Sequence, residues 1–258
     1  MGKVIAIVNQ KGGVGKTTSA VNLAAAVGDK GYKVFLADID PQGNATSGLG
    51  INKRALDQSA YDVMINSVPA KDVIIESEYD NVWVLPSNMA LAGAELELVD
   101  MDRRESRLKT AIAPVKADFD FIFFDCPPSL GLITLNALCA SDTVMVPIQC
   151  EYYALEGLSQ LMSTVRQVKR LYNPMIEIEG VLLTMYDGRL NLTQQVVDEV
   201  KRFFPKKVYS SVIPRNVRLS EAPSFGQPIM YYDRSSKGTS AYNDFADEFL
   251  RLNGKNAD

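Results

Sequence analysis

The sequence predicts an α/β fold with a doubly wound, mostly parallel β-sheet and helices on both faces, in three layers. Two observations predict it. Short apolar runs recur along the chain and alternate with helix-like segments, as parallel strands and their crossover helices do. The first run leads into a glycine-rich turn that opens a helix, the unit from which Rossmann-like sheets are built. No repeat, linker or charge block divides the chain, so we expect one domain over residues 1–258.

The first strand and the loop after it carry the clearest functional signal. A β-branched run at 4–8 precedes the loop at 10–18, and a helical pattern extends from Thr17 to about Lys30. Glycines let such a loop aim successive backbone N–H groups into one concavity at the positive end of the helix. The loop therefore predicts a phosphate cradle made by Gly12, Gly13, Val14, Gly15, Lys16, Thr17 and Thr18.

Within this cradle, Lys16 can reach the outer phosphates of a nucleotide and the Thr17 hydroxyl can ligate Mg²⁺. The loop departs from the usual G-x-x-x-x-G-K-[ST] pattern, because Gln10 stands where the first glycine is expected and Lys11 follows it. This form resembles the "deviant" Walker A loop of the ParA/MinD ATPases. In that family the extra lysine reaches across a dimer interface to the partner's nucleotide. The alternative interpretation of Lys11 is a solvated charge beside the loop.

The remaining elements alternate between buried strands and helices. We expect strands at 33–38, 82–86, 119–125, 143–147, 179–185 and 207–213, helices at about 155–171, 192–204 and 240–252, and short helices on both sides of the strand at 82–86. Sheets of this kind bind ligands beyond the carboxyl ends of their strands. Four segments meet that condition: 10–18, 38–46, 125–129 and the stretch from Pro214.

Three aspartates lie in these segments. Asp125 ends an apolar strand and has the form of the carboxylate that holds Mg²⁺, directly or through water, in enzymes with a phosphate loop. Asp38 and Asp40 end the second strand, which would run beside the nucleotide. Each of them alone is more simply a turn residue. Together, and after a phosphate loop, they favour phosphoryl transfer, which requires positioning and charge neutralisation.

Composition excludes several kinds of chemistry. The chain has no histidine, which removes His-based triads, His general bases and histidine metal sites. Its three cysteines, Cys126, Cys139 and Cys150, form no C-x-x-C pair and predict reduced thiols in a cytoplasmic protein. Neither a signal peptide nor a membrane span is visible, so we expect no membrane partner and no helix-turn-helix module before the first strand.

Charge is unevenly distributed along the chain. The net charge of −4 gives no global sign of nucleic-acid binding. From Arg166 to Arg218, however, ten basic residues stand against five acidic ones, so this stretch carries +5 and the remainder −9. Such asymmetry suits contacts with a phosphate backbone. The alternative is a set of solvated helix faces.

Motifs along nearly the whole chain resemble the Soj type of chromosomal ParA proteins. They stand at 38–44 (DIDPQGN), 125–129 (DCPPS), 149–157 (QCEYYALEG) and 213–223 (IPRNVRLSEAP). The resemblance implies a Mg-ATP-dependent ATPase that acts in chromosome segregation. ATP would close two subunits into a homodimer that binds double-stranded DNA without sequence preference. A ParB (Spo0J-type) activator would stimulate hydrolysis and release. The resemblance also implies control of replication initiation, with the replication initiator as a partner, and a cytoplasmic, nucleoid-associated location.

The resemblance further implies a role for each site residue. Lys11 would touch the partner's phosphates, Lys16 the β- and γ-phosphates and Thr18 the α-phosphate, while Asp40 would position the attacking water. Mg²⁺ would be served by Thr17, Asp38 and Asp125. The adenine would lie near Met185, Pro214 and Arg215. DNA would be contacted by Arg189, Arg215 and Arg218.

Three other classes use the same fold. A MinD-like membrane-cycling ATPase ends in a basic amphipathic helix, whereas the segment expected at 240–252 carries Asp244, Asp247 and Glu248 against Arg251. An iron–sulfur carrier would bridge a cluster through paired cysteines, but no second cluster cysteine accompanies Cys126. A metabolic ATP-dependent ligase would need a substrate site, and none is recognisable.

Overall fold

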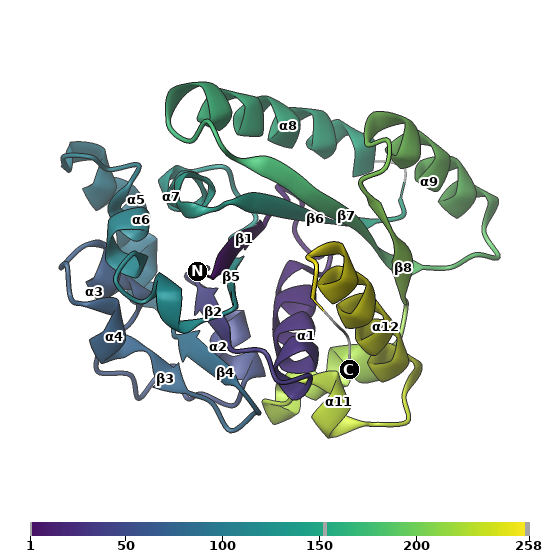
Figure 1. The fold of residues 1–258 in the computed structure, drawn as a ribbon, viewed down its shortest axis with the longest axis horizontal. Helices are drawn as coiled ribbons and strands as arrows, with labels where there is room; N and C mark the ends of the chain where they lie inside the picture. The colour runs from purple at the N-terminus through teal and green to yellow at the C-terminus, as the bar shows by residue number, and fades with distance from the viewer. Residues whose placement is uncertain (1, 152–153, 256–258) are drawn as a thin grey trace.

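An eight-stranded sheet forms the centre of the computed structural model, which describes residues 2–151 and 154–255, with only the backbone of 154–156. The strands are β1 (Lys3–Ile7), β2 (Val34–Asp38), β3 (Ile75–Glu76), β4 (Val82–Leu85), β5 (Phe121–Asp125), β6 (Thr143–Gln149), β7 (Glu177–Tyr186) and β8 (Val208–Pro214). Their order is β3-β4-β2-β5-β1-β6-β7-β8 (Figure 1), and among the described strands only the short β3 runs antiparallel. Tyr152 and Tyr153, part of the motif at 149–157, lie outside the described residues.

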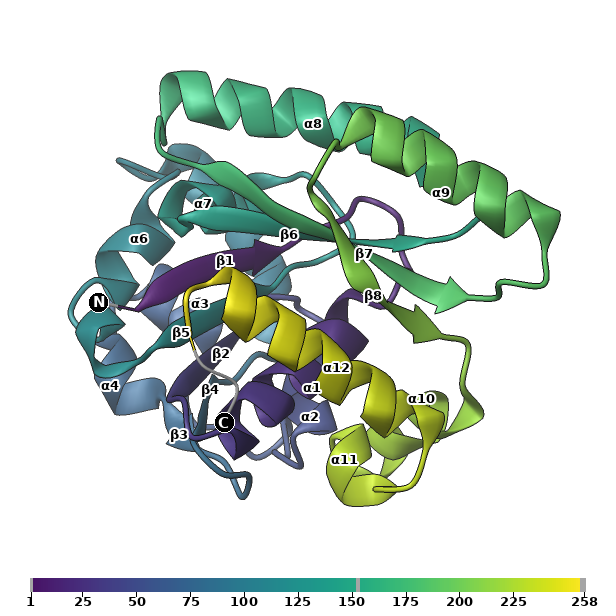
Figure 2. The same cartoon turned by 45° about the vertical axis from the view of Figure 1, so that its right-hand side comes forward.

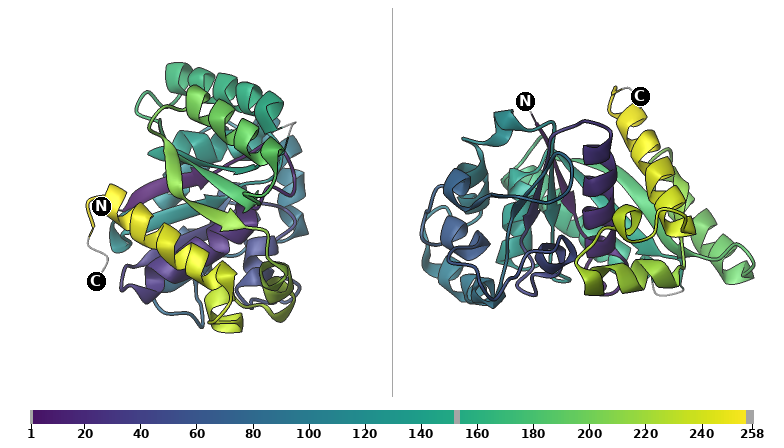
Figure 3. Two further views of the ribbon diagram at one scale, coloured as in Figure 1. Left: turned by 90° about the vertical axis from the view of Figure 1, so that its right-hand side faces the viewer. Right: turned by 90° about the horizontal axis from the view of Figure 1, so that it is seen from below.

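Helices cover both faces of the sheet (Figures 1 and 3). They are α1 (Lys16–Asp29), α2 (Asn44–Gly48), α3 (Ala60–Met64), α4 (Ala70–Val73), α5 (Ala94–Glu97), α6 (Arg107–Ile112), α7 (Leu132–Ala140), α8 (Ala154–Leu171), α9 (Asn191–Phe203), α10 (Val217–Glu221), α11 (Ile229–Tyr232) and α12 (Lys237–Leu252). Short 3₁₀ turns stand at Met89–Gly93, Leu98–Asp100, Lys116–Asp118 and Ala222–Phe225. One face carries α1 and α12, which pack side by side (Figure 2), and the other carries α7, α8 and α9.

The central strands are apolar on both sides because each side faces its own core. In β1, Ile5 and Ile7 belong to the core under α1 and α12, whereas Val4 and Ala6 belong to the core under α7 and α8. Two cores explain why these strands read as continuous apolar runs in the sequence. Among the described residues, every helix falls short of the length or apolar character that crossing a bilayer requires.

The predicted fold class is confirmed, and each predicted strand and long helix ends within three residues of the observed element. Within the described residues, five strands and α-helices were not predicted: β3, α7, and the helices α2, α10 and α11, which are only four or five residues long. The strand β3 is only two residues long, and α7 is so apolar all round that it lacks a helical stripe.

The strand register brings the functional loops together. Asp38 of β2 pairs with Asp125 of β5, and Asp125 pairs on its other side with Ile7 of β1. The glycine-rich loop therefore starts directly beside the two aspartates, at the carboxyl edge of the sheet.

Candidate active site

The loop between β1 and α1 has the backbone of an anion-binding turn. Gly13 (φ 74°) and Gly15 (φ 85°) both adopt left-handed conformations, which a side chain would strain. Gly15 is the N-cap of α1, so the first amides of a 14-residue helix point into the loop. From β7, the Thr184 hydroxyl donates a 2.8 Å hydrogen bond to the Val14 carbonyl and holds the outer side of the turn.

Lys16 is the first residue of α1 and is only 7% exposed. Burial lowers the pKa of its ammonium, and the neighbouring Asp125 carboxylate acts in the opposite direction. Its one hydrogen bond within the described residues is a 3.2 Å contact from Nζ to the Lys11 carbonyl. An ammonium has three donors, so two remain for phosphate oxygens.

Asp38 and Asp125 are fully buried and differ in their hydrogen bonding. Asp38 accepts 2.7 Å hydrogen bonds from both the amide and the hydroxyl of Thr46, and a third from the Asp40 amide. Among the described residues, neither oxygen of Asp125 has a hydrogen-bond partner, although the Thr17 hydroxyl lies nearby. A buried carboxylate without partners is costly, which is typical of a group that awaits a cation.

Both carboxyl groups of this pair have raised pKa values. Burial raises the pKa of Asp38 to about 6, against the opposing hydrogen bonds from Thr46. Burial, and then the charge of Asp38, raise the pKa of Asp125 well above its usual range.

Asp125→Asn is expected to stabilise the protein in the absence of nucleotide and metal. The change removes a buried charge without breaking a hydrogen bond, so unfolding should cost about 1–3 kcal/mol more. Because folding raises the pKa of Asp125, its destabilising charge is absent below the unfolded-state pKa and grows as pH rises through the folded-state pKa. The gain in Tm, measured in EDTA, should therefore be widest near pH 8 and shrink toward pH 5. Asp118→Asn, at an exposed position, is the control. An Asp125→Asn variant less stable than the wild type at pH 8 would contradict this account.

Asp40 lies just beyond the pair and is 7% exposed. Its side chain accepts one hydrogen bond, 2.9 Å from the Gln42 amide. Its backbone carbonyl accepts the Ser87 hydroxyl at 2.8 Å and the Gly43 amide at 2.9 Å. The loop is thus held through its backbone, and one carboxylate oxygen remains available to a water molecule.

Lys11 lies at the mouth of the loop, where it forms an ion pair. Its Nζ is 3.1 Å from Glu151 Oε2, and the Lys11 side chain is 35% exposed. Glu151 in turn accepts a hydrogen bond from the Gln149 amide group, and the Lys11 amide donates to Asn9 Oδ1 at 3.0 Å. Lys11 is therefore neither buried nor simply solvated: it is held by a partner from the end of β6.

A pocket of about 370 Å³ adjoins the loop where β7 and β8 end. Met185, Pro214 and Arg215, predicted near adenine, all line it together with Gly15 and Thr18. Met185 has φ 49°, an uncommon left-handed conformation for a non-glycine residue and one that concentrates at functional sites. Pockets of this size suit a purine base.

The three arginines predicted to contact DNA differ in their surroundings. Arg189 follows β7, is 88% exposed, and makes two hydrogen bonds (2.6 and 2.8 Å) to the carboxylate of Asp187. These bonds lower the pKa of Asp187 to about 2. Arg215 is exposed and lines the pocket.

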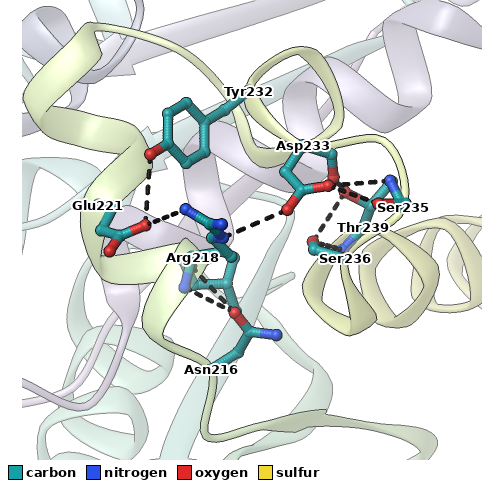
Figure 4. A network of polar contacts seen from close by, with 9 residues as sticks. Asn216, Arg218, Glu221, Tyr232, Asp233, Ser235, Ser236 and Thr239 are labelled. Atoms are coloured by element: carbon teal, nitrogen blue, oxygen red, sulfur yellow. Dashed lines mark hydrogen bonds and ion pairs between the residues drawn. The ribbon is translucent and has the colours of Figure 1, made fainter.

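Arg218 on α10 is half-exposed and forms ion pairs with two acidic residues (Figure 4). Its guanidinium lies 2.9 Å from Glu221 and 3.4 Å from Asp233, and Tyr232 donates a hydrogen bond to Glu221. The α10 helix is capped by Asn216, whose side chain accepts from the Arg218 amide. Arg218 therefore links α10, which lines the pocket, to the turn before α12, and a phosphate would compete with two carboxylates for it.

The residues present fit Mg²⁺ brought by a nucleotide. Within residues 2–151 and 154–255, no group of three or more His, Cys, Asp or Glu side chains could hold a metal by itself. Mg²⁺ commonly binds through one or two carboxylates and completes its shell with water and phosphate oxygens. The unpartnered Asp125, next to Asp38 and close to the Thr17 hydroxyl, provides that partial set.

Several contributors to the site were missed by sequence reasoning. They are Thr46, which holds Asp38; Thr184, which holds the loop; and Glu151, which holds Lys11. Each acts through a contact between distant parts of the fold or across a loop, and no local pattern marks it. Two motifs could have drawn attention to two of these residues: the motif at 38–44 ends two residues before Thr46, and the motif at 149–157 contains Glu151.

The structure disfavours two of the alternative classes. The apolar side of α12 is already buried, with Tyr242, Phe245 and Phe249 at 0–1% exposure, so it is not available to a lipid surface. Cys126, Cys139 and Cys150 are free and buried, and burial raises the pKa of each thiol, which is the environment of inert cysteines.

Comparisons with known proteins identify relatives over nearly the full length. A family model described as an AAA domain matches residues 2–178. The sporulation initiation inhibitor protein Soj of Bacillus subtilis is 58% identical over 248 residues, covering 96% of this chain and 98% of that protein. The chromosome partitioning protein ParA of Myxococcus xanthus is 51% identical over 251 residues, covering 97% and 89%. A solved structure of cobyrinic acid a,c-diamide synthase from Mycobacterium smegmatis, with bound ADP and magnesium, has a TM-score of 0.85 at 37% identity, covering 97% and 95%.

Proposed function

This chain belongs to the Soj/ParA family of chromosome-partitioning ATPases, and from that premise we propose that it hydrolyses ATP with Mg²⁺ to drive a cycle of dimerisation and DNA binding. One observation carries the proposal. A phosphate loop, three aspartates and a purine-sized pocket share one edge of the sheet, with an unpartnered carboxylate beside the loop. Residues 1–258 would act as one domain.

ATP would be held along the line from the loop to the pocket. The amides of 12–18 and the Nζ of Lys16 would face the phosphates, while Met185, Pro214 and Arg215 line the pocket that would take the base. Bound Mg²⁺ would neutralise charge on the outer phosphates, and it would be held by Thr17 with Asp38 and Asp125. Because the pKa of Asp38 is raised to about 6 and that of Asp125 is also raised, Mg²⁺ must compete with protons for these carboxyls as the pH falls.

Asp40 would position the water that attacks the terminal phosphate. One oxygen of its carboxylate accepts a hydrogen bond from the Gln42 amide, and the backbone contacts of the loop keep Asp40 in place. Such positioning requires geometry more than a particular pKa. Asp40 therefore fits a role in the chemical step and not in nucleotide binding.

Lys11 would act in the active site of a second copy of the chain. It lies at the loop's mouth and its partner Glu151 is itself exposed, so the pair can separate when another surface arrives. A lysine supplied by the partner would neutralise transition-state charge, as an arginine finger does. Hydrolysis would then require a dimer.

DNA binding would use Arg189 and Arg215, with Arg218 beside them. Arg189 is the most exposed of the ion-paired arginines, and its pairing with Asp187 is a surface contact of small energy that a phosphate can displace. Two such half-sites in one dimer bind by avidity, so ATP could switch DNA affinity through assembly alone.

Arg189→Glu is expected to weaken DNA retention by at least about tenfold per subunit, because a phosphate contact becomes a repulsion. Filter retention of duplex DNA with ATP, at several salt concentrations, measures it, and the salt dependence should become shallower. Dimerisation with ATP should persist. Arg103→Glu, the same charge change beside α6 at the far end of the sheet, is the control. Retention that survives in the Arg189 variant at physiological salt would remove this arginine from the DNA surface.

The remaining partners follow from the family. We propose a ParB-type activator that stimulates hydrolysis, a nucleoid-associated location in the cytoplasm and a contribution to control of replication initiation. ATP turnover measured alone, with duplex DNA, and with DNA plus the N-terminal peptide of a ParB-type protein tests the proposed function. Turnover that neither addition raises would contradict it.

The Mycobacterium smegmatis structure suggests a second candidate, an ATP-dependent amide synthase. The same experiment with cobyrinic acid and ammonium in place of DNA distinguishes the two. Turnover coupled to amide formation would favour the synthase.

A further inference from the structure

The start of α7 is held by a residue that the proposed mechanism does not use. The helix follows the loop at 126–131, which begins at Asp125, and its N-cap Gly131 has no side chain to satisfy the first amides. Glu95 on α5 takes that place: its carboxylate accepts the Leu132 amide at 2.8 Å and the Ile133 amide at 3.2 Å. The two helices pack against each other (Figure 1).

Gly131 is shaped to this contact. A Cβ at Gly131 would lie 2.5 Å from Glu95 Oε1, closer than any two such atoms approach. The Gly131 backbone is extended and would accept alanine, so an added methyl group would conflict with the carboxylate in its present position and not with the backbone conformation. The missing side chain and the capping carboxylate therefore complement each other across 36 residues of sequence.

The segment that carries Glu95 also holds the other aspartate loop. It begins after β4 with Ser87, whose hydroxyl donates to the Asp40 carbonyl and whose amide donates to Thr46 Oγ1 at 2.9 Å. Thr46 is the residue that fixes Asp38. A single stretch of about ten residues, from Ser87 to Glu95, therefore touches both loops that bear the carboxylates.

From these contacts we infer that Glu95 is a positioning residue for the loop at 126–131 and, through it, for the Asp125 carboxylate, which it keeps in register with Asp38 and Asp40. This inference rests on the proposed Mg-ATP hydrolysis. Because neither oxygen of Asp125 has a hydrogen bond within the described residues, its position depends on the backbone at both of its ends. Strand β5 holds one end. On the other side, the Cys126 amide donates to the Ile7 carbonyl, and Glu95 holds the far end of the loop at the Leu132 and Ile133 amides.

Hydrogen exchange and Mg²⁺ dependence together test the inference. In Glu95→Ala without nucleotide, amide exchange over residues 126–133 should accelerate by at least about tenfold, while 121–125 in β5 stays protected. With ATP, the Mg²⁺ concentration that gives half-maximal hydrolysis should rise by about tenfold, as with other residues that orient metal ligands. Glu95→Gln keeps one acceptor oxygen and should fall between wild type and alanine.

Gly131→Ala provides an independent approach to the same contact, because the new methyl group displaces the carboxylate. It should reproduce the Glu95→Ala effects, and the double variant should be no worse than either single one. Glu97→Gln is the matched control, since Glu97 lies on the same helix and accepts only the exposed Tyr61 hydroxyl.

Unchanged exchange over 126–133 would overturn the inference, and so would altered exchange with an unchanged Mg²⁺ requirement, which would leave Glu95 a simple helix cap. The exchange measurement needs no nucleotide, so its result can be interpreted even if the wild-type chain does not hydrolyse ATP. That last result would instead reject the proposed function.

Discussion

Lys11→Ala is expected to lower ATP hydrolysis by roughly 10³–10⁵-fold, the range that a charge supplied in trans contributes to phosphoryl transfer. Nucleotide binding should be largely kept. Lys16 donates to the backbone carbonyl of Lys11, which alanine retains, and the glycine turns are unchanged. Single-turnover hydrolysis and equilibrium binding of a labelled nucleotide separate the two effects.

A mixing experiment shows which subunit uses Lys11. In a heterodimer of Lys11→Ala with Asp40→Ala, the first subunit keeps Asp40 and receives Lys11 from the second. One complete site per heterodimer would restore about a quarter of wild-type turnover in an equal mixture of randomly pairing subunits. If Lys11 acts within its own subunit, neither site is complete and the mixture stays inactive.

Glu151→Gln is the matched control for Lys11→Ala. Either change breaks the ion pair between Lys11 and Glu151, but only Lys11→Ala removes the ammonium. Turnover close to wild type in Glu151→Gln would assign the loss in Lys11→Ala to the charge. An equal loss in both would show that the ion pair itself matters.

Asp40→Ala is expected to lower hydrolysis by about 10²–10⁴-fold while ATP binding remains, because a positioned carboxylate acts in the chemical step. The backbone carbonyl of Asp40 still accepts Ser87 and Gly43, so only the contact with the Gln42 amide is lost. With ATP present, the variant should accumulate as a DNA-bound dimer, which gel filtration and DNA retention detect together.

Asp57→Ala, at an exposed position outside the site, controls for the general effect of removing an aspartate. The Asp40 variant has a second distinguishing property: its hydrolysis should not respond to DNA or to a ParB-type peptide. A variant with wild-type turnover would remove Asp40 from its proposed role.

Much of the site was predictable because its chemistry is local. The left-handed glycines and the helix start at Lys16 follow from contiguous residues, and Asp38 and Asp125 are marked by the apolar strands they end. The parallel sheet then brings strand ends to one edge, so the meeting of these loops also followed from the order of elements. The antiparallel strand β3 could not be predicted from the sequence, because a strand of two residues shows no periodicity.

Charge counting alone predicted the basic stretch but not how its members are used. Arg189 and Arg218 contribute equally to that count. In the fold, Arg189 is exposed with one partner, whereas Arg218 joins a network with Glu221 and Asp233. The difference depends on where α10 meets the turn before α12, which no sequence pattern records.

The sequence by itself determined the fold class, the phosphate loop and the identity of the carboxylates, because each depends on neighbouring residues and on strand order. Only the tertiary structure decided what holds them: Glu151 beside Lys11, Thr46 on Asp38, and Glu95 at the start of α7. The physical reason is that a hydrogen bond or ion pair forms over about 3 Å, and the chain reaches those distances between remote residues only through the register and packing of the whole sheet.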